Sequence, residues 1–149
     1  MGRQIVHDHD VAGMGCGLDG GDVFKWRAGN KLEVELFGSL PVDAVASLLE
    51  KALEDRSDNE INDQLRSHSK NAVTLARVQE ELERDELSPE ARTALGNAAG
   101  GNVEGKKAWF KSVSAMEDVG REIILPHLAN SEKVFKDVVV ALRNWCVGA

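Results

Sequence analysis

The chain has 149 residues, which is enough for one domain of ordinary size or for part of a larger one. Apolar residues make up 42% and charged residues 29%, a composition that excludes an intrinsically disordered chain and favours a globular fold. The net charge is −7, and twelve acidic against six basic residues between positions 50 and 90 place most of the excess there. This acidic middle repels phosphates, so it excludes a protein that coats nucleic acid through a broad basic face.

The two cysteines, Cys16 and Cys146, stand far apart and show no C-x-x-C spacing. They predict neither a disulfide framework nor a zinc knuckle. No apolar stretch approaches the roughly 20 residues that a membrane span needs, and the N-terminus lacks a signal-peptide pattern. The sequence therefore favours a cytoplasmic protein that makes no contact with a membrane.

Two extended stretches come first along the chain. Gln4–His7 contains two β-branched residues, and Val23–Trp26 lies between glycines, so both are predicted to be short strands. Five glycines between Gly13 and Gly21 separate them. This run has neither G-x-G-x-x-G nor the Lys-Ser/Thr of a phosphate loop, so it predicts a mobile connection rather than a nucleotide site.

Everything after these stretches is predicted to be helical. Apolar positions with a period near 3.6 predict a helix from about Val42 to Leu53, which Ser39 could cap with Pro41 in its first turn. A second helix is predicted to begin at Ser57, because Ser57 and the glutamate three residues later have the spacing of a capping box. The stretch from about Asn71 to Arg84 is charged and weakly amphipathic.

Three further helix starts are marked by serines. Ser88 is followed by proline and glutamate, a strong start signal, and the helix that it opens is predicted to end before Gly100. Ser112 or a nearby serine opens the next helix, which Pro126 should kink or end. Ser131 is predicted to cap the last helix. That helix has a broad apolar stripe formed by Val134, Phe135, Val138, Val139, Leu142 and Trp145.

Alternating aspartates and histidines end the first predicted strand. Because side chains alternate in a strand, Asp8 and Asp10 would point to the same face, where two carboxylates suit Mg²⁺ or Mn²⁺. The alternative is that this D-x-D only starts a solvated turn. His7 and His9 could instead bind a transition metal together with Asp8.

Two further acids, Glu33 and Glu35, stand in "NKLEVELFGSLP" next to a presumed helix start. They could be exposed surface acids. Either could also complete a carboxylate cluster if the chain folds back on Asp8 and Asp10.

A basic segment, "GKKAWFKS", places Lys106, Lys107 and Lys111 beside Trp109 and Phe110. In one interpretation the two aromatic residues anchor a loop on the core and the lysines are solvated. In the other, the lysines form a basic group that faces a scissile phosphate.

Taken in order, "IVHDHD", "VFKWRAGNKLEVELFGSLP", and "GKKAWFKS" followed by "MEDVGREIILPHL" resemble the C-terminal portion of an ATP-dependent endonuclease of the overcoming-lysogenization-defect (OLD) family. In such proteins an ATPase precedes a TOPRIM nuclease domain, the fold shared by topoisomerases and primases. The resemblance covers nearly all of the chain, although its motifs are short. It implies hydrolysis of DNA phosphodiesters with Mg²⁺ or Mn²⁺ as the cofactor.

The resemblance also implies roles for individual acids. Asp8 and Asp10 match the TOPRIM D-x-D that binds divalent metal. Glu33 matches the later acid of the family, with Glu35 as its competitor, so all four are candidate metal ligands and Glu33 is also a candidate catalytic residue.

A lysine completes the implied site. Lys107 or Lys111 would match the basic residue that stabilises charge on the phosphate. The implied chemistry is two-metal hydrolysis: one ion activates water, the other stabilises the leaving oxygen, and the lysine neutralises the developing negative charge.

The chain departs from the family pattern in two ways. TOPRIM domains begin with a strand and a catalytic glutamate that precede the D-x-D, but only seven residues precede Asp8 here. No Walker motif is present, so an ATPase activity is not expected of this chain. We therefore expect at most a weak nuclease from the chain alone.

These observations together predict an α/β fold. A partial TOPRIM-like sheet of a few short strands, residues 1–38, would precede a mainly α-helical region, residues 39–149, that packs on it. The predicted function is a metal-dependent TOPRIM-type nuclease portion, an endonuclease fragment that is incomplete without its N-terminal half or a partner. The alternative is a noncatalytic helical protein-interaction module whose N-terminal strands pair with another protein.

Partners are expected in either case. DNA is the expected substrate of the nuclease, and an ATPase or the missing TOPRIM half would be supplied by another chain. An exposed, incomplete sheet edge has unpaired backbone groups that can pair with a strand of another chain, which predicts a homo-oligomer or a hetero-complex.

Overall fold

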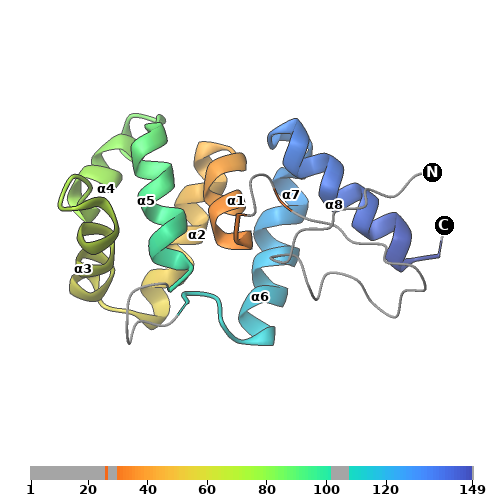
Figure 1. Ribbon diagram of the computed structural model, residues 1–149, viewed down its shortest axis with the longest axis horizontal. Coiled ribbons are helices and arrows are strands. Elements are labelled where there is room, and N and C mark those ends of the chain that lie inside the picture. The colour runs from red at the N-terminus through yellow and green to blue at the C-terminus, as the bar shows by residue number, and fades with distance from the viewer. Residues whose placement is uncertain (1–25, 27–29, 102–107, 149) are drawn as a thin grey trace.

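Helices make up all the regular structure in the part of the chain that is described. The computed structural model describes residues 26, 30–101 and 108–148, and Figure 1 shows a set of short helices packed around one another. The prediction of an α/β fold with a partial TOPRIM-like sheet is wrong, because these residues contain no strand. Within the expected sheet segment, the described residues from Leu32 onward form a helix instead. The two predicted strands lie outside the described residues, apart from Trp26, which is in neither strand nor helix.

Helices α1 (Leu32–Ser39) and α5 (Pro89–Ala99) form the centre of the fold. Their backbones come very close at Gly96, where an added Cβ would lie 2.7 Å from the Cα of Val34. Glycine is needed at this position because no side chain fits between the helices. Helix α1 begins before the expected domain boundary and ends just after it.

Helix α2 (Val42–Asp55) confirms the predicted apolar period. Its buried residues are Ala44, Val45, Leu48, Leu49 and Ala52. The predicted cap is wrong: Ser39 is the last residue of α1, and α2 starts after Pro41 with no side-chain cap. The short turn between α1 and α2 is held by Arg92 of α5, whose Nη1 donates to the carbonyl oxygens of Phe37 and Leu40 at 2.9 and 2.8 Å.

Helices α3 (Asp58–Ser69) and α4 (Leu75–Glu83) form one end of the molecule. Ser57 caps α3 as predicted, since its Oγ accepts from the backbone N–H of Glu60 at 3.2 Å. Lys70 and Asn71 have φ values of 55° and 67°, a left-handed conformation that ends α3. Helix α4 therefore begins at Leu75, inside the charged stretch.

The prediction for α5 is confirmed at both ends. The Ser88 side chain caps it by accepting from the backbone N–H of Ala91, and proline occupies its first turn. The helix ends at Ala99, before the two glycines, and Gly101 has a φ of 68°.

The next helical run changes register just before Pro126, and its last α-helical segment ends one residue after it, in line with the prediction of a kink or an end at that proline. It consists of α6 (Val113–Val119), a π-helical turn (Gly120–Ile124), α7 (Leu125–His127) and a short 3-10 turn (Leu128–Asn130). In the π turn the backbone N–H of Leu125 bonds to the Gly120 carbonyl, five residues back. This change of register directly precedes Pro126, so the wider turn accommodates a residue that an α-helix interior would reject.

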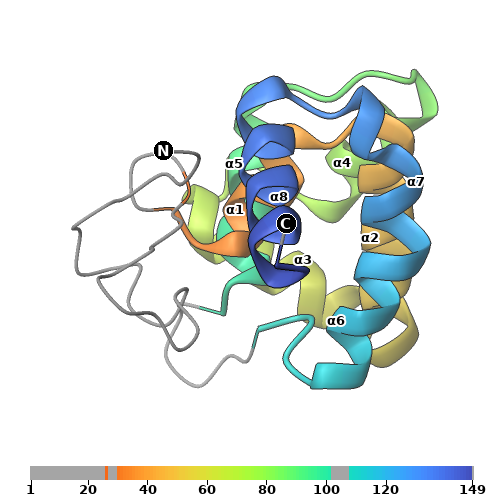
Figure 2. The same cartoon turned by 90° about the vertical axis from the view of Figure 1, so that its right-hand side faces the viewer.

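Helix α8 (Lys133–Cys146) closes the fold. Ser131 does not cap it: the Ser131 Oγ donates to the Leu128 carbonyl at 2.6 Å, and Glu132 is the boundary residue. The backbone N–H of Glu132 donates to the Ser39 carbonyl at 2.9 Å, which ties the start of α8 to the end of α1. Figures 1 and 2 place α8 at the opposite end of the long axis from α3 and α4.

One continuous apolar core joins these helices. Its largest fully buried apolar side chains are Phe37, Phe135, Leu36, Leu40, Leu48, Ile61, Leu65, Leu95 and Val45. Trp26 belongs to this core and stacks on Phe135 of α8, with 5.4 Å between ring centroids and 19° between ring planes. No helix among the described residues is long and apolar enough to cross a bilayer.

Candidate functional site

Part of the predicted metal site lies outside the described residues. This holds for Asp8 and Asp10, for the two histidines beside Asp8, and for Lys106 and Lys107 of the basic segment. The remaining members, Glu33, Glu35 and Lys111, are placed.

Glu33 and Glu35 both belong to the first turn of α1 and have different surroundings. The Glu35 side chain is buried, and its Oε2 accepts from the Asn30 amide Nδ2 at 2.6 Å. Glu33 is only partly buried. Residues two apart on a helix do not face each other, so these two carboxylates cannot ligate one ion from the same side.

Lys111 lies apart from these acids in sequence, after two buried aromatic residues. Trp109 and Phe110 are 3% and 4% exposed, whereas Lys111 is exposed. The Trp109 indole packs edge-on against Phe37 of α1 at 5.8 Å between centroids. For the described half of "GKKAWFKS" this favours the interpretation in which aromatic residues anchor the segment and the lysine is solvated.

Polar contacts from α3 and from the C-cap residue of α2 hold the same segment in place. The Trp109 Nε1–H donates to the buried Gln64 Oε1 at 2.7 Å. Arg56 donates from Nη2 to the Ala108 carbonyl at 2.9 Å and from Nη1 to the Trp109 carbonyl at 3.3 Å. The Gln64 Nε2 is buried without a partner, so Gln64 serves as the acceptor for Trp109 at the cost of one unmade hydrogen bond.

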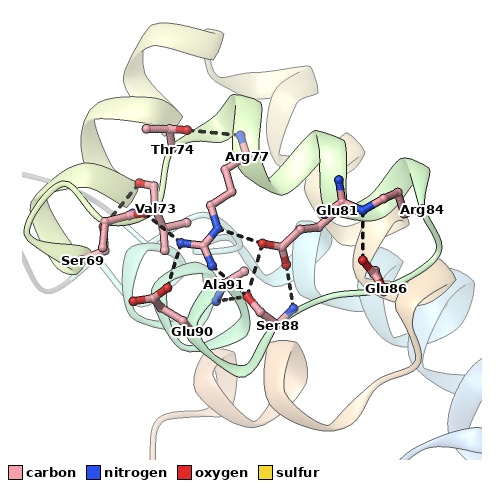
Figure 3. Close-up of polar contacts among 11 residues, drawn as sticks. Ser69, Val73, Thr74, Arg77, Glu81, Arg84, Glu86, Ser88, Glu90 and Ala91 are labelled. Carbon is pink, nitrogen blue, oxygen red and sulfur yellow. Dashed lines mark hydrogen bonds and ion pairs between the residues drawn. The ribbon is translucent and has the colours of Figure 1, made fainter.

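A denser polar cluster that sequence reasoning missed joins α4, α5 and the turn before α4 (Figure 3). Arg77 is its centre, and its Nε donates to Glu81 Oε2 at 2.8 Å. Its Nη1 contacts Glu90 Oε1 at 2.8 Å and the Ala72 carbonyl at 2.9 Å, and its Nη2 reaches Ser88 Oγ at 3.3 Å. These contacts raise the pKa of Arg77, chiefly through the hydrogen bonds to Glu81 and then to Glu90.

Glu81 is the buried member of this cluster, at 6% exposure. Its Oε1 accepts from the backbone N–H of Ser88 at 2.6 Å, and its Oε2 also accepts from the Ser88 hydroxyl at 3.3 Å. Burial raises the pKa of Glu81, but the bonds from Ser88 and Arg77 together outweigh burial, so the pKa lies below its usual value. A carboxylate that is ionised and engaged on both oxygens is a poor general base, so this cluster acts as a clamp between α4 and α5.

His68 of α3 is the described histidine with the most perturbed surroundings. Burial, and secondly the charge of Lys31, lowers its pKa, so the ring is neutral at pH 7. Its Nε2 is buried without a partner. A shallow cavity of about 300 Å³ adjoins it, lined by His68, Ser69, Pro89, Glu90, Thr93 and Ala94. The Ser69 hydroxyl already donates to the Leu65 carbonyl, so it is engaged in local backbone contacts.

His127 is the other described histidine, and it makes a surface contact. Its Nδ1 lies 2.8 Å from the Ile123 carbonyl and its Nε2 lies 3.3 Å from Asp43 Oδ2. This pair links α7 to the first turn of α2. Across residues 26, 30–101 and 108–148, no three His, Cys, Asp or Glu side chains converge closely enough to hold a metal ion.

Part of the clamp could have been found from the sequence. Arg77 and Glu81 are four residues apart on a charged helix, the spacing of a helical ion pair. The contacts that join Arg77 and Glu81 to Ser88 and Glu90 could not have been predicted, because they depend on how the chain turns between α4 and α5. The burial of Glu81 follows from that same turn.

The described part of the chain is a helical domain, and its largest charged cluster, around Arg77 and Glu81, is paired internally. No family model, known protein or solved structure matches the chain. The resemblance to the OLD nucleases and the assignment of a metal site therefore stay predictions.

Proposed function

We propose that this chain is a noncatalytic helical protein-interaction module. The observation that carries the proposal is the uneven placement of exposed apolar side chains. Among the described residues, the large exposed ones all lie in α6, α7, α8 and the cap of α8: Val113, Leu125, Val134, Val140 and Val147. Single exposed apolar residues are ordinary on any protein surface, but their restriction to one half of the molecule favours a contact surface there.

Helix α8 is the principal element of this surface. It is amphipathic, yet Phe135 is its only fully buried residue, and Val138 and Val139 are only partly covered. Val134 and Val140 are 44% and 38% exposed. The helix thus presents apolar groups both toward the core and toward solvent, so that a partner could cover the outer ones.

The satisfied polar clusters support this proposal over an enzymatic one. The best-formed cluster, around Arg77 and Glu81, uses its polar atoms to join helices. In the cavity beside His68, the Ser69 hydroxyl is hydrogen-bonded to the Leu65 carbonyl. The rival nuclease function depends on Asp8 and Asp10, which lie outside the described residues.

Affinity capture from cells that express the tagged full chain tests the proposal. The arms are wild type, Val140→Asp/Val147→Asp, and a matched control in which exposed residues far from α8 are changed, Ala72→Asp/Ala76→Asp. We expect a specific protein to be retained by wild type and by the control and to be lost with the α8 variant. It should then bind purified wild type directly. An identical set of retained proteins in all three arms would contradict the proposal.

A metal-binding experiment distinguishes the proposed interaction module from the rival nuclease function. Mn²⁺ is titrated calorimetrically into wild type and Asp8→Ala/Asp10→Ala, and nicking of supercoiled plasmid is followed for the same pair and for Lys111→Ala. We expect no heat and no nicking from any of them. Heat and nicking that appear in wild type and vanish in the aspartate variant would establish the nuclease instead.

A further inference from the structure

The outward face of α8 carries a stripe that mixes positive charge with apolar groups. Lys136, Val140, Arg143 and Val147 follow one another at intervals of four, three and four residues, so they lie along one side of the helix. We call these four residues the α8 stripe. Val140 is 38% and Val147, the residue just after the helix, is 68% exposed; Arg143 is exposed and Lys136 is partly exposed.

No carboxylate among the described residues forms an ion pair with either cation of the α8 stripe. The Lys136 Nζ has only a long contact of 3.4 Å, to the Ala129 carbonyl, and Arg143 has no carboxylate within reach among the described residues. Lys133, by contrast, pairs with Asp137 on the same helix. The stripe therefore offers two uncompensated charges beside two uncovered valines.

A complementary surface lies at the turn between α2 and α3. Glu54, Asp55 and Asp58 are exposed there, and no described cation pairs with any of them. We call these three residues the acidic corner. Glu54 and Asp55 occupy the last turn of α2, which contains no basic residue. The helix dipole disfavours negative charge at this end, so the two acids oppose local helix stability. The neighbouring Arg56 forms its ion pair with Glu60, and its guanidinium also binds the Ala108 and Trp109 carbonyls.

We propose that the α8 stripe of one molecule docks on the acidic corner of a second copy. This rests on the proposed function and names the partner. Figures 1 and 2 place α8 at one end of the long axis and the turn between α2 and α3 toward the other, so the two surfaces cannot meet within one molecule. Docking therefore joins copies head to tail through two different surfaces. Such contacts generate rings or open chains rather than a closed symmetric dimer.

The contact combines charged and apolar groups, which alternate along the α8 stripe. Opposite charges steer the two surfaces together and fix their register, while burial of Val140 and Val147 supplies the nonpolar contact. Because the charges are exposed, salt screens them, and the association must weaken as ionic strength rises.

Sedimentation velocity over a concentration series tests the proposal, using the full chain in low-salt and high-salt buffer. Two charge-reversed variants are compared with wild type: Lys136→Glu/Arg143→Glu on the stripe and Glu54→Lys/Asp55→Lys on the corner. We expect association of wild type at low salt, and roughly tenfold weaker association for each variant alone. An equimolar mixture of the two variants should associate again, because each then offers the surface that the other lacks. Lys70→Glu/Lys111→Glu is the matched control for the stripe variant. It changes the net charge by the same amount but should retain association.

The Glu54→Lys/Asp55→Lys variant also shows whether a loss of association results from loss of the docking surface or from unfolding. Lysines at the end of α2 suit the helix dipole, so its thermal stability should be equal to or above that of wild type while its association falls. Wild type that stays monomeric at low salt would overturn self-docking, as would a mixture of variants that fails to reassociate. Capture of a different protein through Val140 and Val147 would then leave the interaction function standing with another partner. If wild type neither self-associates nor captures another protein through these valines, both the self-docking proposal and the proposed interaction function are overturned.

Discussion

Glu81 shows at the scale of one residue how burial and charge are reconciled. Its carboxylate accepts from the backbone and hydroxyl of Ser88 and from Arg77 (Figure 3), so ionisation is favoured despite burial. The sequence predicts the Ser88 cap from its own neighbours, since a cap is a local feature. It does not predict that Glu81 reaches Ser88, because that contact depends on the turn between two helices.

Replacement of Glu81 should therefore have a pH-dependent cost. Glu81→Gln removes the charge, so at pH 7 we expect a loss of about 1–3 kcal/mol in the free energy of unfolding. The folded pKa lies below the usual value of 4.5, so the contribution is complete above that value and disappears as the pH falls through the folded pKa. Wild type and variant should accordingly converge in acid. Urea unfolding at several pH values measures this, with exposed Glu83→Gln as the control; a difference that stays constant with pH would contradict it.

Two helical glycines should respond in opposite ways to the same substitution. An added Cβ at Gly38 meets nothing within 4 Å, so Gly38→Ala should stabilise α1 by about 0.5–1 kcal/mol. At Gly96 the Cβ would meet the Val34 backbone at 2.7 Å, so Gly96→Ala should destabilise the protein by about 1–3 kcal/mol. Thermal unfolding of both variants measures the difference. Equal shifts of the same sign would argue against close packing of α1 on α5.

At the scale of elements, sequence reasoning succeeds where the signal is local. The apolar period of α2 and the caps Ser57, Ser88 and Ser112 predict helices that the structure contains. It fails where a tertiary contact intervenes. Ser39 was expected to cap α2, but α1 extends through it, and Arg92 of α5 holds the turn that follows.

The segment after α5 offers an element-scale prediction. Trp109→Phe keeps the buried ring but removes the N–H that donates to Gln64, which leaves an amide buried without any partner. We expect a loss of about 1–3 kcal/mol. Adding Gln64→Leu should recover most of it, because both polar partners are then replaced by apolar groups. Chemical denaturation of the two single variants and the double variant checks this, and purely additive losses would show that the hydrogen bond is not what couples the residues.

At the scale of the whole molecule, the sheet was the main error. It was inferred from short β-branched stretches near the N-terminus and from the OLD resemblance, not from a periodic pattern that extends into the described residues. Those residues instead form helices around a shared core. Of the candidate metal site, Glu33 and Glu35 are on one helix but on different sides of it, an arrangement that follows from helical geometry once α1 is known.

Trp26 connects the N-terminal part of the chain to this core through its stack on Phe135. We expect Trp26→Ala and Phe135→Ala each to cost about 3–5 kcal/mol, with the double variant costing about 0.5–1.5 kcal/mol less than their sum. A double-mutant cycle by denaturant unfolding measures that coupling. A cycle with no coupling would indicate that the rings do not touch in solution.

The same stack sets a limit on how far the protein can be shortened. Phe135 has no solvent exposure, and one side of its ring is covered by the indole of residue 26, which stands ahead of every described helix. A truncated version that started at α1 would retain each helix and still open a hydrophobic gap over the first turn of α8. We therefore expect such a version to be less stable than one that also contains this tryptophan.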